Sequence, residues 1–148
     1  MKQDHFRIKA VEATEPYRLT ITFGDDEYMM VDLSEIIDRI AVMAPLKDKT
    51  LFSKVQVGEH GWAAVWIPDE LELGGDNLRA KAVEQAGGIS HERIWEWMYR
   101  NGLTLDTAAE ALGISRRMLA YYRSGQKPIP KHIWLACVGW EAEKNKAA

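Results

Sequence analysis

Two adjacent arginines begin a short segment whose side chains suit contact with nucleic acid. In the stretch "SRRMLAYYRS", from Ser115 to Ser124, helical spacing turns Arg116, Arg117, Ala120 and Tyr121 outward. Arginine donates paired hydrogen bonds to O6 and N7 of guanine, and each such contact contributes about 1–3 kcal/mol of discrimination between bases. Small and aromatic residues after the arginines suit the major groove of DNA. We therefore expect these four side chains to face the edges of the bases.

Four further residues flank this face and carry hydrogen-bond donors or positive charge. The positive end of the helix dipole and the free N–H groups at the start of the segment favour a phosphate. Basic side chains beyond the segment would add contacts to the DNA backbone. The expected phosphate contacts are Ser115, Arg123, Lys127 and Lys131. The alternative is that the arginine pair is an ordinary solvated helix face, or that the fold contacts a protein instead of DNA.

A tight turn must hold this helix against the one before it. Thr104 can cap a helix that ends at Leu112, Gly113 stops it, and only "GIS" separates it from the next helix. Helices joined so closely cross at a steep angle, and Ala109 supplies the small residue that a close crossing needs. The shared core is expected to contain Leu112, Ile114, Leu119 and Tyr122.

Residues 94–136 resemble the helix-turn-helix of the phage-repressor (Cro/C1, lambda-repressor-like) family. The resemblance rests on "NGLTLDTAAEALGISRRMLAYYRSGQKP" and on the exit "SGQKPIP" before another helix. It implies a five-helix bundle in which Ser115 to Ser124 is the recognition helix. The sequence departs from the family at Leu105, where members often carry a Gln that clamps phosphate, and at Arg123, where many carry Glu. The second departure makes the face more basic.

The first half of the chain shows the period of β-strands. "FRIKAVEA", "YRLTITF" and "YMMVDL" predict three strands, with the turn "GDDE" between the last two. A short helix over "DLSEIIDRIA", capped by Ser34 and ended by Pro45, should follow. A second hairpin is predicted around the glycine-rich turn Gly58 to Gly61, with "DELELGGD" as a loop after it. A helix is expected over about residues 77–85.

This order of elements resembles a family of small bacterial β-rich domains of unknown function, over about residues 5–82. Genes for such domains often neighbour those of toxin-like partners. The resemblance implies an antitoxin-like or regulatory context and a protein partner for this half of the chain.

Charge and composition divide the chain at the segment Ala86 to Gly88. Residues 1–85 carry 10 Lys/Arg and 16 Asp/Glu, whereas residues 86–148 carry 9 and 6, so the net charges are −6 and +3. Adjacent glycines permit a sharp change of direction. We predict an α+β protein of two domains: a β-rich α+β domain at residues 1–86, and an all-α, lambda-repressor-like helix-turn-helix bundle at residues 89–148.

Apolar side chains in the second half exceed what one small bundle can bury. Trp97 is expected in the bundle core, while Trp95 is either half exposed or docked on the first domain. The last helix, "KHIWLACVGWEAEK", is apolar on nearly every side. A second copy of the chain would cover it, and readers of the repressor type bind paired half-sites as dimers. The first domain is the alternative cover.

The sequence offers no catalytic or metal-binding pattern. The four histidines are scattered, and neither glycine pair has the context of a phosphate-binding loop. Asp25 to Glu27 are expected to be solvated turn residues, and Cys137 a small buried hydrophobe. We expect no enzymatic activity, no catalytic residue, no metal and no cofactor. No apolar run is long enough to span a bilayer, and with no secretion signal and one cysteine the chain fits a reducing cytoplasm.

The sequence therefore predicts a cytoplasmic DNA-binding protein, a transcriptional regulator that reads the major groove of double-stranded DNA with the helix Ser115 to Ser124. The alternative is an antitoxin-like or adaptor module whose helix bundle docks a protein partner. The acidic first domain would repel DNA and should point away from the groove.

Overall fold

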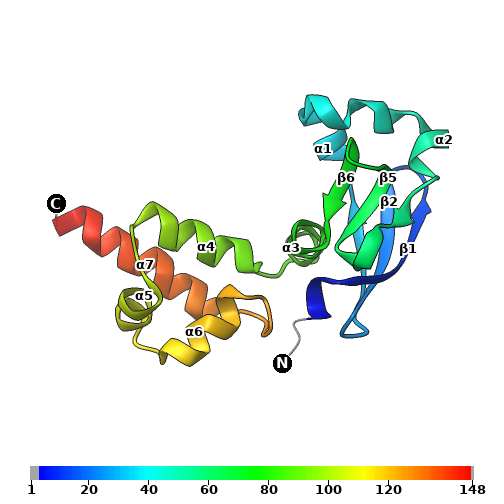
Figure 1. Cartoon of the computed structure of the whole chain (residues 1–148). Helices are drawn as coiled ribbons and strands as arrows, with labels where there is room; N and C mark the ends of the chain where they lie inside the picture. The colour runs from blue at the N-terminus through cyan, green and yellow to red at the C-terminus, as the bar shows by residue number, and fades with distance from the viewer. Residues whose placement is uncertain (1–3, 148) are drawn as a thin grey trace. The chain divides into compact units, whose positions relative to one another are not determined.

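The structure is a computed structural model that describes residues 4–147. The chain forms two compact units, Met1–Ala86 and Gly87–Ala148. All the strands lie in the first unit, and four consecutive α-helices make up the described part of the second (Figure 1). The predicted α+β class is thereby confirmed, with the strands first and the helical bundle after them.

The first sheet consists of three antiparallel strands in the order β1-β2-β3. Their bounds are Ile8–Thr14 for β1, Arg18–Phe23 for β2 and Tyr28–Asp32 for β3. Alternate residues of β2 point into the core, because side chains alternate between the two faces of a strand. Leu19, Ile21 and Phe23 are all completely buried, as the period-2 pattern predicts.

One expectation for β1 is wrong, and a bulge explains the error. The alternation in "FRIKAVEA" favours Phe6, Ile8 and Ala10 on one face, with Val11 next to it, but the register with β2 shifts between Ile8 and Ala10. An extra residue in one strand reverses the parity of the residues beyond it. Ala10 is therefore exposed, while Val11 and Ala13 pack against the core.

The second sheet contains one strand more than the sequence predicts. It is antiparallel, in the order β4-β5-β6, with bounds Gln56–Val57, Ala63–Ile67 and Leu71–Gly74. The stretch "DELELGGD" was expected to be a loop, yet it supplies β6. Asp69, with a φ of 64°, turns the chain back towards β5. Leu71 is buried in the core and Leu73 packs against it, so the alternation "LEL" is a strand signal.

Short helices complete the first unit. They are η1 (Asp4–Phe6), α1 (Ser34–Arg39), η2 (Ala41–Lys47), α2 (Lys49–Phe52), η3 (Glu59–Gly61) and α3 (Gly75–Gln85). Two local predictions need correction. Ser34 is the first residue of α1 rather than its cap, and its backbone N–H donates to the carboxylate of Asp32 at 2.8 Å. Pro45 lies inside η2, so α1 ends earlier, at Arg39.

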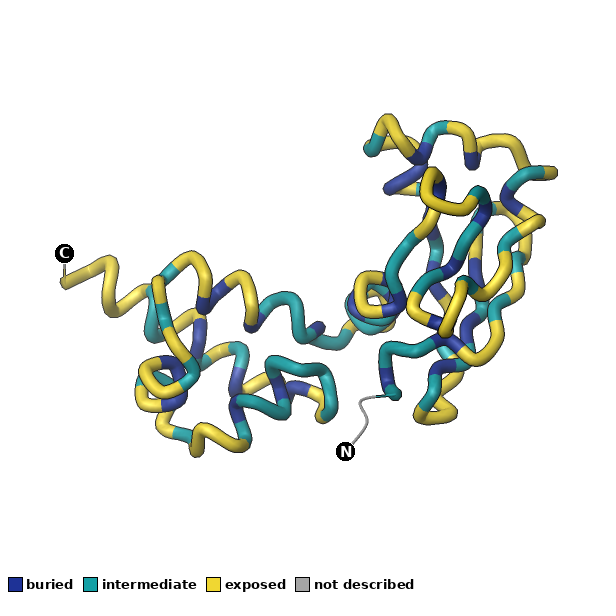
Figure 2. Tube along the Cα trace, viewed as in Figure 1, coloured by how far each residue is buried: buried dark blue, intermediate teal, exposed yellow. Residues whose placement is uncertain are grey.

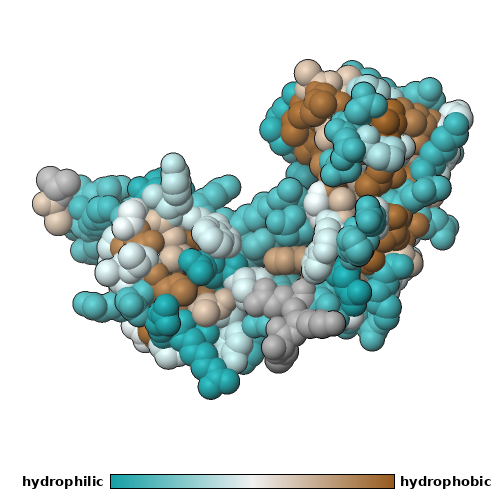
Figure 3. All heavy atoms as spheres, in the orientation of Figure 1, coloured by the Kyte–Doolittle hydropathy of each residue, from teal (hydrophilic) through white to brown (hydrophobic). Residues whose placement is uncertain are grey.

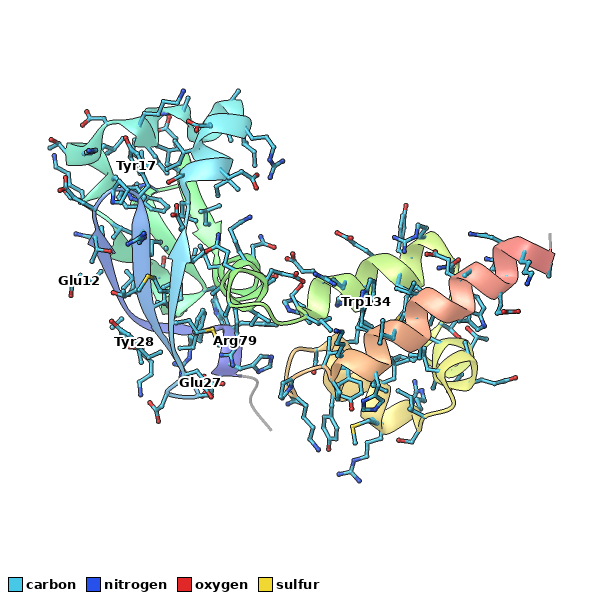
Figure 4. The ribbon with its side chains drawn as sticks, turned by 180° about the vertical axis from the view of Figure 1, so that it is seen from behind. Glu12, Tyr17, Glu27, Tyr28, Arg79 and Trp134 are labelled. Atoms are coloured by element: carbon cyan, nitrogen blue, oxygen red, sulfur yellow. The ribbon has the colours of Figure 1, made fainter. Side chains whose placement is uncertain are left out.

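Arg79 on α3 fastens the β2–β3 turn to the helix (Figure 4). Its two terminal nitrogens donate to the two carboxylate oxygens of Asp25, at 3.0 and 2.9 Å, and its guanidinium lies 5.0 Å from the ring centre of Phe23. Burial raises the pKa of Asp25, but the hydrogen bonds from Arg79 and from the backbone of Glu27 outweigh it, so the pKa lies below its usual value. Asp25 is thus an exposed turn residue, as expected, and it is also paired with Arg79.

The second unit is a bundle of α4 (His91–Arg100), α5 (Leu105–Leu112), α6 (Arg116–Arg123) and α7 (Lys131–Ala147). The described residues of this unit hold four α-helices, not the five that the resemblance implied. The segment after α6 contains Gly125, Pro128 and Pro130, and α7 then continues as one helix of 17 residues. The fully buried core is made of Ile94, Trp97, Ala108, Leu119 and Cys137.

Several apolar side chains of this unit stay exposed. Trp97 is completely buried, as expected, whereas Trp95 is 51% exposed. On α7, Leu135 and Val138 are 54% and 46% exposed. The helix is exposed from Ala142 to Ala147, where its trace is yellow in Figure 2.

Candidate nucleic-acid interface

The turn between α5 and α6 has the local structure that its sequence predicts. Thr104 caps α5, accepting a hydrogen bond from the backbone of Thr107, while the Thr107 hydroxyl accepts one from the backbone of Thr104. Gly113 has a φ of 70° and ends α5. The N–H of Ile114 returns to the carbonyl of Ala109 at 3.1 Å, which is the closing bond of a Schellman motif. Ser115 then caps α6, because its hydroxyl oxygen accepts from the N–H of Met118 at 3.1 Å.

Packing against α5 sets which face of α6 points outward. Ala109 is buried where the two helices meet, and Leu119 and Tyr122 of α6 are buried in the same core. Leu112 and Ile114 pack against that core while partly exposed. Since each residue of a helix advances by about 100°, the side opposite this core carries Arg117, Ala120, Tyr121 and Ser124. Arg117 is exposed, and the other three are partly exposed.

Arg117 and Tyr121 form a pair on the outward face. The Nε atom of Arg117 donates to the phenol oxygen of Tyr121 at 3.0 Å, and the guanidinium carbon lies 5.7 Å from the ring centre. The spacing i, i+4 brings such side chains together on one helix. This hydrogen bond uses Nε, so it does not occupy either Nη group of Arg117.

Lys127 joins the same pair from the loop after α6. Its ammonium nitrogen lies 4.5 Å from the centre of the Tyr121 ring, within the range of a cation–π contact. Two cations therefore meet at one aromatic side chain. Lys131, the first residue of α7, is exposed.

Arg116 and Arg123 lie on the flanks of α6 and contact neighbouring helices. Arg116 Nε is 3.0 Å from a carboxylate oxygen of Asp106 on α5. The Arg123 guanidinium lies 4.5 Å from the ring centre of Trp95 on α4. Both partners were missed at the sequence level, because each pair joins different helices and has no signature in local spacing. Trp95 is therefore covered in part by an arginine of its own bundle.

The chain segment that contains this face carries charge of one sign over a long stretch. From Ala111 to Trp140 the chain contains five Lys/Arg and no Asp/Glu. Hydrophilic side chains project from the edge of the bundle where α6 lies (Figure 3). Because phosphates carry the negative charge of DNA, such a surface attracts nucleic acid without regard to sequence.

The predicted site residues thus fall into two groups. The outward face of α6 brings together Arg117, Ala120 and Tyr121, and Lys127 lies against it. The remaining predicted contacts are placed around it: Arg116 and Arg123 on the flanks, Ser115 as the cap of α6 and Lys131 at the start of α7.

Metal centres and membrane-spanning helices are absent from residues 4–147. Within this range, no three His, Cys, Asp or Glu side chains lie where they could hold a metal ion together. Within the same range, no helix combines the length and apolar character needed to cross a membrane.

No known protein-family model and no curated protein matches the chain. Among solved structures, it is similar to the crystal structure of the "Putative DNA Binding Protein NE0471 from Nitrosomonas europaea ATCC 19718". The two share 48% sequence identity and a TM-score of 0.86, over 96% of this chain and 91% of the other. The chain therefore belongs to the same protein family as NE0471.

Proposed function

We propose that the chain is a DNA-binding transcriptional regulator that reads the major groove with α6. The observation that carries this proposal is the outward face of α6, where exposed Arg117 lies beside Lys127 in a stretch without acidic residues. NE0471, a relative at 48% identity, is described as a putative DNA-binding protein, which agrees with nucleic acid as the ligand.

The residues of the site have two roles: some contact the edges of the bases, and others contact phosphates. Arg117 is the main reader of base edges, through a bidentate contact with guanine. Without DNA, Arg116 forms an ion pair with Asp106. Because both side chains are largely exposed, this ion pair is weak, and a phosphate or base can replace the carboxylate at little cost in free energy. Ala120 lies on the reading face and leaves room for the base edge. Phosphate contacts come from Ser115, Arg123, Lys127 and Lys131.

The arrangement of α5, the turn at Gly113 and α6 supports a helix-turn-helix of the lambda-repressor-like kind. Such modules bind as dimers to half-sites separated by about one helical turn of DNA, roughly 34–36 Å. A homodimer is part of this proposal, because Leu135 and Val138 on α7 are apolar and exposed in the single chain. The acidic first unit would serve a protein partner and keep away from DNA.

The experiment that tests the proposal is selection from a pool of random-sequence DNA duplexes, over several rounds, at about 50 and 200 mM salt. We expect enrichment of a palindrome with half-sites about 10 base pairs apart. Neutralising about five phosphates should make the logarithm of the binding constant fall with the logarithm of salt concentration, at a slope of about −4.5.

A negative result of this selection would reject the proposed function. If no sequence is enriched and binding does not respond to salt, α6 serves another purpose, and the antitoxin-like or adaptor function is favoured instead. In that case, a protein partner that binds by apolar contacts should show almost no dependence on salt.

A further inference from the structure

The hydroxyl and the ring of Tyr121 are both engaged within the protein. The hydroxyl accepts from Arg117 Nε at 3.0 Å, and the ring holds the Lys127 ammonium at 4.5 Å from its centre. A tyrosine that reads a base must turn its hydroxyl or its ring towards DNA. In this structure, both groups already face the two cations.

The backbone brings Lys127 to Tyr121 through the end of α6. Gly125 takes a φ of 78°, which only glycine adopts at little cost, and reverses the chain. The carbonyl of Tyr121 then accepts from the N–H groups of Gln126 and Lys127, at 3.1 and 3.4 Å. Lys127 is thus fixed to Tyr121 through its main chain as well as its side chain.

We propose that Tyr121 is a positioning residue that holds Arg117 and Lys127 as one unit for a guanine and a neighbouring phosphate. This inference rests on the proposed function and changes the role predicted for Tyr121, from a base contact to a support. The hydrogen bond to Nε fixes the plane of the Arg117 guanidinium. Its two Nη groups then lie at the free end of the side chain, in the geometry that matches O6 and N7 of guanine.

Two cations at one ring carry an electrostatic cost in the absence of DNA. Like charges repel, and in water they gain little from a shared aromatic ring. A phosphate next to the recognised guanine would remove that repulsion. A preorganised pair also loses less side-chain entropy when DNA binds, which favours the specific complex over non-specific ones.

The test compares Tyr121→Phe and Tyr121→Leu in the full-length protein. Phenylalanine keeps the ring for Lys127 and removes only the acceptor for Arg117. Tyr121→Phe should lower the discrimination between the selected site and a variant with that guanine replaced, by about three- to tenfold, the range of one ordinary hydrogen bond. Its affinity for unrelated DNA and its salt slope should stay unchanged.

Leucine removes both contacts, so Tyr121→Leu should also weaken binding to unrelated DNA and reduce the steepness of the salt slope by about 0.9, one phosphate contact. Tyr99→Phe is the matched control. Tyr99 is 89% exposed on α4, and loss of its hydroxyl should change none of these quantities.

A double-mutant cycle with Arg117→Ala separates positioning from a direct contact. If Tyr121 acts through Arg117, Tyr121→Phe has no further effect on discrimination once Arg117 is alanine. An unchanged discrimination in Tyr121→Phe, or an equal loss in both backgrounds, would overturn the inference. These outcomes presuppose salt-dependent, selective binding by the parent protein, and its absence would instead reject the proposed function.

Discussion

The first arginine of α6 is held by a carboxylate of the preceding helix: Arg116 Nε lies 3.0 Å from Oδ1 of Asp106. Both side chains are exposed, at 65% and 78%, so the pair contributes little to stability. Its larger effect is on the electric field at the start of α6. The carboxylate offsets a positive charge at the place where a phosphate would bind.

Replacement of Asp106 by asparagine should therefore strengthen binding to DNA of any sequence. We expect a gain of about two- to fivefold at low salt, the size of one exposed charge interaction, and a smaller gain at high salt. Fluorescence anisotropy with a random duplex at about 50 and 200 mM salt measures it. Glu143→Gln on α7 makes the same change in net charge, and an equal gain there would show that only net charge matters.

Arg117→Ala and Lys131→Ala should weaken binding in different ways. Loss of Arg117 is expected to cost about 1–3 kcal/mol at the selected site and to relax the preference at one base. Loss of Lys131 should weaken binding evenly over all sequences and reduce the salt slope by about 0.9. Titrations with the selected duplex and a scrambled one distinguish the two. If both variants bind like the parent, α6 is not the reading helix.

The pattern of caps and turns around α5 and α6 could be predicted from the sequence because each signal is local. Thr104 and Ser115 cap helices through contacts three residues away, and Gly113 requires only its own φ. The buried faces follow from the 3.6-residue period. These features depend on neighbours in the chain, so short windows of sequence contain the information.

The features that were missed depend on contacts between segments distant in sequence. Nothing near Arg123 indicates that Trp95 lies beneath it, and the bidentate contact of Arg79 with Asp25 spans 54 positions. The bulge in β1 likewise appears only in its register with β2. Strand β6 has just two inward residues, Leu71 and Leu73, so its alternation is short and the flanking turn residues hide it.

Two glycines of the second unit should respond oppositely to alanine. Gly113 has room for a Cβ, but its φ of 70° is unfavourable for alanine, and Gly113→Ala should cost about 1–2 kcal/mol of unfolding free energy. Gly139 lies within α7, also with nothing near its Cβ position. Gly139→Ala should add about 0.5–1 kcal/mol, because glycine weakens a helix interior. Urea unfolding at 25 °C measures both, and stabilisation by Gly113→Ala would contradict the left-handed turn.

Glu141 should make the stability of the bundle depend on acidic pH. Its carboxylate accepts two hydrogen bonds from Arg100, at 2.8 and 3.0 Å, and one from Asn101 at 2.8 Å. These bonds lower the pKa of Glu141 to about 2, from an ordinary value of 4.5. A pKa depressed in the folded state gives stability that is complete above the unfolded value and is lost as the pH falls from about 4.5 towards 2.

Glu141→Gln should accordingly be less stable than the parent at neutral pH, with a difference that shrinks in that acidic range. Urea titrations at pH 7, 5, 4 and 3 measure the difference. Glu143→Gln is the control. A gap between Glu141→Gln and the parent that stays constant from pH 7 to pH 3 would mean that the carboxylate is not held in this way.

Cys137 should be inert in the folded protein. Its side chain is completely buried in the bundle core, and this burial raises the pKa of the thiol to about 12. Only the thiolate attacks alkylating reagents, and the raised pKa leaves a far smaller fraction of this thiol ionised at pH 8 than of an ordinary thiol. Labelling with iodoacetamide at pH 8 should therefore be slow in buffer and rapid in urea. Rapid labelling in buffer would mean that α7 opens readily and exposes the core beneath α6, so the same experiment reports how firmly the reading helix is supported.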